Sequence, residues 1–105
     1  MWIRSAFWIG KPKPGAEIDF DQAINGHIIP AFRLIPAVDR ALLLWPKRRE
    51  DGPPDLYCQV MVEFSSKTAL EEMLASPERL ALRPRVVAAA ALFDGGISHI
   101  DYEVA

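Results

Sequence analysis

The segment Trp2–Ile9 reads WIRSAFWI, and this stretch decides the fold of the chain. It is rich in aromatic and β-branched residues and is followed by Gly10, so it predicts a strand. Large apolar groups fall on both of its faces: Ile3, Phe7 and Ile9 on one, Trp2 and Trp8 on the other. A sheet that contains this strand must therefore be covered on both sides.

The first helix is expected to start at Phe20, with Asp19 as N-cap and Gln22 completing a capping box. Residues 37–45, AVDRALLLW, predict a second strand, which is again apolar on both faces. A charged turn follows at Pro46–Pro54, and its basic residues are interspersed with acidic ones, as in a solvated loop tip. The alternating run LYCQVMVEF predicts a third strand over Leu56–Phe64.

Further along the chain, Ser65 or Ser66 can cap a helix over residues 67–75, and Ser76 with Pro77 restarts a helical segment. We expect Pro84 to interrupt this segment and Asp94, Gly95 and Gly96 to end it. Residues 97–104 predict the last strand.

This order predicts a single α+β domain over residues 1–105, with a ferredoxin-like βαββαβ antiparallel sheet and both helices on one face. The helices leave the second apolar face of the sheet bare. A second copy of the sheet, packed about a two-fold axis, would cover it, and burial at about 25 cal/mol per Å² would supply several kcal/mol. The sequence therefore predicts a homodimer, arranged as a dimeric α+β barrel.

Composition excludes several classes of partner. The net charge of −2 disfavours nucleic acid, whose phosphates need a basic face. The apolar runs are too short to span a membrane, and the N-terminus fits a secretory signal poorly. The single cysteine, Cys58, cannot form an internal disulfide, so we expect a cytoplasmic protein.

The helix FDQAINGHIIPAF, residues 20–32, carries the candidate reactive group. Its apolar stripe includes Ile24 and Ile28, and His27 is predicted to lie on this stripe. Gly26 and Pro30 weaken the helix there, because proline presses on the carbonyl four residues before it, and a kink would open a gap beside the histidine. His27 is then either a boundary residue bonded to backbone or a proton-transfer group in a cleft.

Alternation suggests which strand residues accompany His27. On the count of apolar residues, the expected helix-facing positions are Ile3, Ser5, Phe7, Cys58, Val60, Val62, Ile100, Tyr102 and Val104. A catalytic pair of His27 and Tyr102 could polarise a carbonyl and move a proton. Predicted substrate-binding residues are Ser5, Phe7, Ile24, Cys58 and Val60.

A possible metal site consists of two histidines and one carboxylate, His27, His99 and Asp101. The same alternation places His99 and Asp101 opposite Tyr102, and therefore away from the helices. No phosphate loop, nucleophile elbow or paired zinc-ligand spacing occurs in the sequence. We therefore expect neither a metal nor a cofactor.

Two stretches resemble EthD-type proteins of the dimeric α+β barrel superfamily. The first is KPKPGAEIDFDQAINGHIIPAFRLIPAVDR, residues 11–40, with its basic turn, Phe20, His27 and Pro30. The second is FSSKTALEEMLASPERLALRPRVVAAAALF, residues 64–93, with a Ser-Pro-Glu step. The sequence departs from the family pattern in two places. His-Ala-Pro is one residue longer here, as His27-Ile28-Ile29-Pro30, and Pro-Gly is replaced by Pro36-Ala37.

The resemblance implies a homodimer with face-to-face sheets and a cleft between sheet and helices in each subunit. It also implies a cofactor-independent enzyme of the monooxygenase, isomerase or cyclase type, acting on an apolar, carbonyl-bearing or aromatic small molecule. The alternatives are a non-catalytic small-molecule-binding or accessory dimer, and haem binding with His27 as axial ligand. Fold alone does not choose among these functions.

Overall fold

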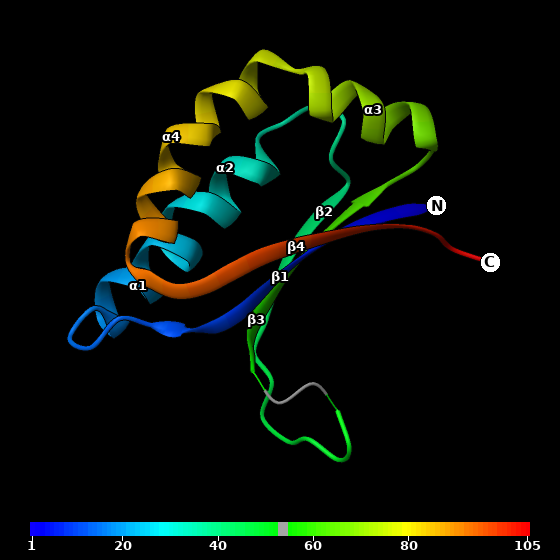
Figure 1. Ribbon diagram of the computed structural model, residues 1–105. Helices are drawn as coiled ribbons and strands as arrows, with labels where there is room; N and C mark the ends of the chain where they lie inside the picture. Colours follow the sequence, from blue (N-terminus) through cyan, green and yellow to red (C-terminus); the bar gives the residue numbers. More distant parts are fainter. Residues whose placement is uncertain (53–54) are drawn as a thin grey trace.

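The computed structural model describes residues 1–52 and 55–105. Four strands and two helical regions follow each other in the predicted order (Figure 1). The elements are β1 (Trp2–Pro12), α1 (Glu17–Ala23), the π-helix η1 (Ile24–Ile28), α2 (Ile29–Arg33), β2 (Arg40–Leu44), β3 (Leu56–Phe64), α3 (Lys67–Ala75), α4 (Pro77–Ala91) and β4 (Phe93–Glu103). Part of the predicted turn at Pro46–Pro54 lies outside the described residues.

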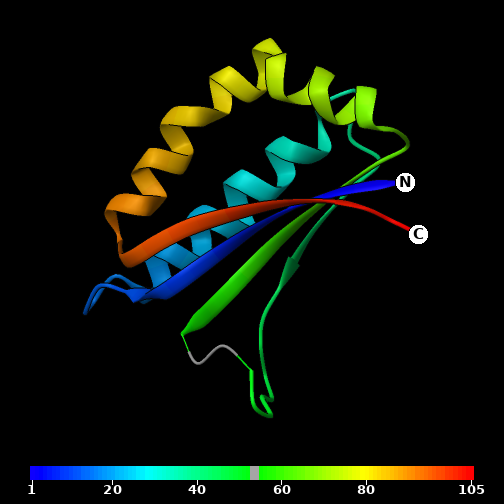
Figure 2. The same ribbon diagram turned by 45° about the vertical axis from the view of Figure 1, so that its right-hand side comes forward.

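The strands form one antiparallel sheet in the order β2-β3-β1-β4, and the helices cover one face of it (Figure 2). The predicted ferredoxin-like fold is therefore confirmed. β1 is central and pairs with both β3 and β4, so the two chain ends lie side by side at one end of the sheet (Figure 1). No helix in the described part of the chain is long and apolar enough to cross a membrane.

The structure corrects the predicted facing of β1 and β4. Ala6 lies opposite Val60 on β3, and Trp8 lies opposite Cys58, so the even-numbered residues of β1 share the face of the buried residues of β3. Ile3, Ser5 and Phe7 therefore lie on the open face, where they were expected toward the helices. Because Ala6 also pairs with His99, the odd-numbered residues of β4 turn toward the helices and Tyr102 does not.

β3 has the predicted bounds and, from Cys58 onward, the predicted alternation. Cys58, Val60, Val62 and Phe64 are buried, and the residues between them are partly exposed. Tyr57 is an exception, because the register shifts between Trp8 and Ile9, and its ring packs on Phe20 from the helix layer. The irregularity brings two consecutive residues of β3 toward the helices.

The first helical region starts earlier than predicted, at Glu17, and Ala16 rather than Asp19 is the N-cap. No side chain caps it; the chain turns at Gly15 instead, and the Phe20 N–H donates to the Ala16 carbonyl. Asp19 lies in the first turn, where its charge favours the helix dipole.

The predicted weak point is a π-helical turn. Pro30 has no N–H to donate to the Gly26 carbonyl, so the α pattern cannot continue, and the Ile29 N–H donates to Ile24 five residues back. This wider turn buries Ile24, Ile28 and Ile29 together and leaves His27 exposed. The extra residue that departs from the family pattern thus coincides with the π turn.

The second helical region follows the predicted caps. Ser66 Oγ accepts from the Ala69 N–H, and Ser76 Oγ accepts from the Arg79 N–H, both at 3.1 Å. Pro84 does not interrupt α4, which continues to Ala91 with the proline exposed. The missing hydrogen bond is tolerated on the solvent side.

Gly95 and Gly96 belong to β4 and do not terminate the helix. Gly10 and Gly95 are partners in the β1–β4 ladder, and both have positive φ. A Cβ at Gly95 would collide with the carbonyl oxygen of Ile9, so the two strands approach this closely only because glycine stands there.

Aromatic rings build the core at this end of the sheet. Phe20 is fully buried and lies 5.1 Å from Trp8 and 5.0 Å from Phe93, measured between ring centroids. Edge and stacked contacts of this kind add to the hydrophobic burial. They fix α1 on the sheet.

Candidate functional site

A cavity of about 230 Å³ lies between the sheet and α4. Its walls are mostly apolar. The sheet contributes Ala6, Trp8, Val60 and Val62; the first helical region contributes Ile28 and Phe32; α4 contributes Leu82 and Val86. An engineered cavity of about 150 Å³ is large enough to bind benzene. This cavity can therefore hold an aromatic ring with substituents.

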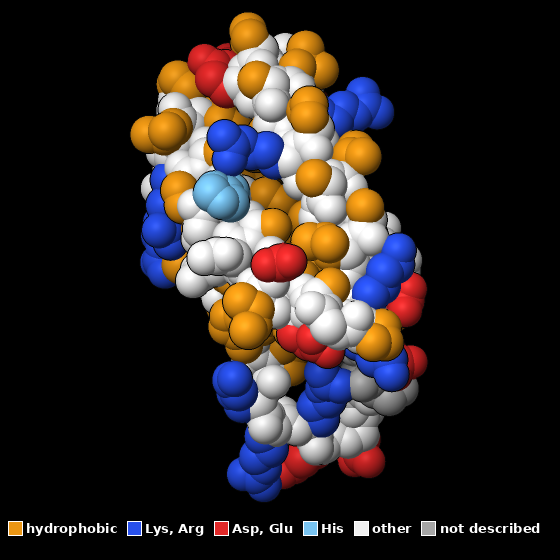
Figure 3. Space-filling model, turned by 90° about the vertical axis from the view of Figure 1, so that its left-hand side faces the viewer, with side chains coloured by type: hydrophobic (Ala, Val, Ile, Leu, Met, Phe, Trp, Pro, Cys, Tyr) orange, Lys and Arg blue, Asp and Glu red, His pale blue; other side chains and the backbone are white. Residues whose placement is uncertain are grey.

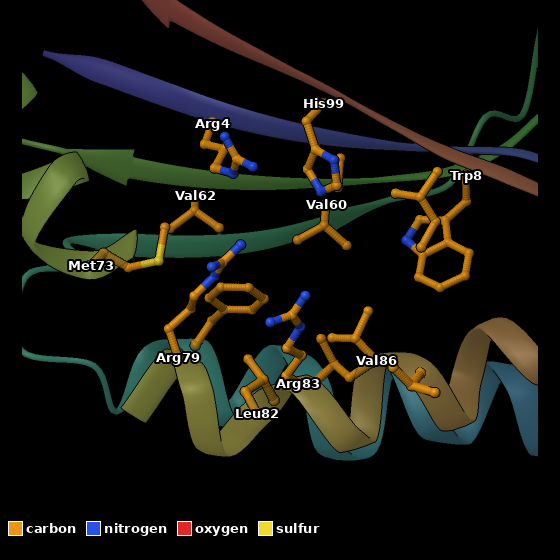
Figure 4. A pocket seen from close by; sticks show the side chains of 15 residues that line it. Arg4, Trp8, Val60, Val62, Met73, Arg79, Leu82, Arg83, Val86 and His99 are labelled. Carbon is orange, nitrogen blue, oxygen red and sulfur yellow. The ribbon is translucent and has the colours of Figure 1, made fainter. Parts of the chain in front are cut away.

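Four basic or titratable side chains complete the lining. Arg4 and His99 project from the sheet toward α4, and Arg79 and Arg83 project from α4 toward the sheet (Figure 4). No Asp or Glu is among the described residues that line the cavity. On the face of the molecule shown in Figure 3, a histidine side chain lies next to a basic side chain, with hydrophobic side chains around them.

The fold positions each of these groups. His99 lies opposite Ala6, whose small side chain leaves space above the sheet. Arg4 is opposite Asp101, and its guanidinium donates to both carboxylate oxygens at 2.9 and 3.1 Å. Arg79 is the third residue of α4, and Arg83 follows one turn later on the same side of the helix.

The surroundings of His99 keep its imidazole neutral. His99 is exposed, yet the atoms around its ring desolvate it enough to lower its pKa, and the positive charges of Arg4 and Arg79 lower it further. Asp101 opposes them and raises it. Because the pKa lies below its ordinary value of 6.5, His99 is unprotonated at neutral pH and can accept a proton.

The residues predicted from sequence are dispersed. Val60 lines the cavity, whereas Ile24 and Cys58 are fully buried in the core and are not part of its lining. Ser5 and Phe7 lie on the open face of the sheet. Ser5 is buried there beside Gln59, whose Nε2 donates to its Oγ at 3.1 Å.

The predicted catalytic pair is not brought together. His27 is exposed on η1 and does not line the cavity, and Tyr102 lies on the open face of the sheet. The buried thiol of Cys58 is no nucleophile, because burial, aided by Asp21, raises its pKa to about 12. Tyr57 likewise stays protonated: burial and its 2.9 Å hydrogen bond to Asp21 raise its pKa to about 12.

Sequence reasoning missed Arg4, Arg79, Arg83 and the inward facing of His99. The signals were present: an arginine inside an apolar strand, and two arginines one helical turn apart with no acidic residue at the matching spacing. The rejected metal set is still not supported. His27 lies outside the cavity, and no cluster of three or more metal-binding side chains occurs among the described residues.

Comparison with solved structures identifies proteins of the same fold. An EthD family protein from Bacillus halodurans is 18% identical, with a TM-score of 0.75, and the match covers 100% of this chain and 99% of that one. A dimeric ferredoxin-like protein of unknown function from Jannaschia is 17% identical, with a TM-score of 0.70, covering 99% of this chain and 100% of the other.

A cofactor-independent oxygenase from Streptomyces nogalater, SnoaB, is also similar. It is 21% identical, with a TM-score of 0.63, and the match covers 98% of this chain and 90% of SnoaB. No family model matches the sequence, and no curated protein matches it significantly. These similarities show the fold.

Proposed function

We propose that this chain, which has the fold of the EthD protein and of the cofactor-independent oxygenase, is a cofactor-independent proton-transfer enzyme. Its substrate is an apolar small molecule, aromatic or carbonyl-bearing, held in the cavity beneath α4. The proton-transfer group is His99. The observation that carries the proposal is a neutral imidazole at an apolar cavity, next to arginines that no carboxylate in the lining neutralises.

The chemistry follows from this arrangement. The imidazole of His99 accepts a proton from an acidic C–H or O–H of the substrate, and the electron pair stays on the substrate as an enolate or phenolate. The positive charge of the arginines that line the cavity stabilises that anion, in a setting where apolar walls strengthen electrostatic interactions. Arg4 contributes less, because Asp101 already pairs with it.

Monooxygenase, isomerase and cyclase reactions can share this first step. In an isomerisation or ring closure, the imidazolium returns its proton to another atom of the same molecule. In an oxygenation, dioxygen is the oxidant that the substrate anion reduces. The proposal therefore concerns the proton transfer, and the later steps depend on the substrate.

Deuterium exchange provides the test. 2-Tetralone is a two-ring ketone with acidic C–H bonds, and its exchange in D₂O can be followed by NMR with the whole protein as catalyst. We expect His99→Gln to lower the catalysed rate by about 10²-fold or more, the usual contribution of a general base. His27→Gln is the matched control and also tests the role predicted for His27 from sequence. Equal rates for wild type and His99→Gln would overturn the proposal.

Non-catalytic binding is the second candidate, favoured by the mostly apolar walls of the cavity. The wild type and its His99→Gln and His27→Gln variants also distinguish a binding protein from an enzyme. A binder would quench the fluorescence of Trp8, which lines the cavity, without accelerating exchange in any variant.

The open face of the sheet supports a second proposal, that the chain works as a homodimer. This face carries Ile3, Phe7, Leu42, Met61, Ile100 and Tyr102, and the last two are 46% and 41% exposed. A structurally similar protein is dimeric. A second copy of the same apolar face is the occupant that fits it best.

A further inference from the structure

The arginines of α4 say what kind of molecule the cavity takes. Arg79 and Arg83 are four residues apart, which places them on the same side of the helix with their Cβ atoms about 5–6 Å apart. Both side chains extend into the cavity (Figure 4). Like charges at this spacing destabilise a helix slightly, so their pairing needs another explanation.

No carboxylate among the described residues is paired with either arginine. The Arg79 guanidinium donates a long hydrogen bond, 3.5 Å, to the Leu74 carbonyl. Arg4, in contrast, is matched by Asp101. The cavity therefore has an excess of positive charge, although the chain as a whole has a net charge of −2.

From these observations we infer that the ligand of this cavity is an apolar or aromatic acid, whose carboxylate binds Arg79 and Arg83 while its ring lies against the apolar wall. The planar guanidinium matches a carboxylate by donating two parallel hydrogen bonds. Arg79 is partly buried and Arg83 is exposed, so the apolar walls strengthen the attraction chiefly at Arg79. The inference rests on the proposed function in one respect, that the same cavity is the substrate site.

The inference also gives the substrate an orientation. His99 stands on the sheet, across the cavity from α4. A carboxylate held at the helix would direct the rest of the molecule toward the imidazole. The acid group would then be the handle for binding, and the atom that loses its proton would lie at the other end of the ligand.

A matched pair of probes tests this. 1-Naphthoate and 1-naphthamide have nearly the same shape and differ in charge, and their dissociation constants can be measured by isothermal titration calorimetry with the whole protein. We expect the acid to bind at least tenfold more tightly than the amide, as a hydrogen bond to a charged group contributes about 1.5–3 kcal/mol. Added salt should narrow the difference.

Variants locate the effect. In Arg79→Gln/Arg83→Gln the preference for the acid should disappear, while affinity for the amide stays within about twofold. Arg85→Gln removes a charge from the same helix outside the cavity lining and should leave the preference intact. Circular dichroism checks that each variant is folded. Arg83→Lys keeps the positive charge at this position but removes the planar guanidinium, which can donate two parallel hydrogen bonds to a carboxylate.

Equal affinity of the wild type for acid and amide would overturn the inference, as would an unchanged preference in the double variant. Binding is measured without turnover, so its failure is distinguishable from failure of the proposed function. If His99→Gln loses exchange activity but the wild type binds acid and amide equally, the proposed function stands and the inference of an acidic ligand is refuted.

Discussion

Arg4 and Asp101 face each other across the β1–β4 ladder, and the guanidinium donates to both carboxylate oxygens. His99 is two residues before Asp101, on the same face of β4. The two charges of this pair therefore act on the imidazole in opposite senses, one lowering its pKa and one raising it. Desolvation of the imidazole lowers this pKa most, and Arg79, across the cavity, lowers it further.

The first prediction follows from these signs. The pKa of His99, measured by NMR titration of its ring protons, should lie below 6.5. Arg79→Gln should raise it, because a positive charge that disfavours the imidazolium is removed, and Asp101→Asn should lower it. Arg83 also faces the cavity, whereas Arg85 does not line it, so Arg85→Gln is the control.

The same shift has a sign for stability. Because folding lowers the pKa of His99, the unfolded chain binds the proton first as the pH falls below 6.5, and the folded state loses stability through that window. His99→Gln should flatten the dependence of the unfolding free energy between about pH 5 and 7. A measured His99 pKa of 6.5 or above would contradict both the expected titration and the expected pH dependence of stability.

The second prediction concerns the subunit interface. Ile100→Glu places a charge on the open face of the sheet, where burying an unpaired carboxylate is costly, so it should convert a dimer into monomers in sedimentation velocity runs. Ile18→Glu makes the same change on α1 at a residue that is 79% exposed, away from the sheet. It should leave the dimer intact. A wild type that sediments as a monomer at micromolar concentration would refute the interface.

The third prediction tests the close approach of β1 and β4. Gly95→Ala should destabilise the fold by more than about 1 kcal/mol, because its Cβ would collide with the Ile9 carbonyl. Gly96→Ala is the neighbouring control, since its Cβ would meet nothing within 4 Å. Urea unfolding measures both. Similar losses at the two positions would show that backbone flexibility, rather than the collision, sets the cost.

The fold could be predicted because β3 and the serine caps are unambiguous. One face of β3 is apolar and the other is not, so its register is fixed by the pattern from Cys58 onward. Ser66 and Ser76 likewise accept the hydrogen bonds that their types predict. These local signals place the second half of the chain and, with it, the order of elements.

The site could not be predicted in the same way, because β1 is apolar on both faces. Alternation alone then allows either the odd-numbered or the even-numbered residues of β1 to face the helices. The choice depends on which residues pair with Val60 and Val62 across the ladder. Pairing puts Arg4 and Ala6 inside and, through them, His99. Choosing the other set of residues placed Arg4 and His99 on the open face of the sheet and Tyr102 on the helix-facing side.

His27 was misplaced for a different reason. A period of 3.6 residues puts it on the apolar stripe, but the π turn at Ile24–Ile28 changes that period at the histidine. Gly26 and Pro30 gave the signal of a disturbance. They did not say whether the helix would bend or widen.

The π turn sets the rotation of α2 relative to α1 about the helix axis. A π turn accommodates one extra residue in an α-helix, so removing one residue from Ile24–Ile28 would return the helix to α geometry and keep its two halves in nearly the same rotation. Phe20 holds the first half in the aromatic cluster, and Ile35 is buried just beyond the second. A single-residue deletion within α1 or α2, in contrast, would rotate one anchored half against the other by about 100°, so the π turn is the place where this helix tolerates a change in length.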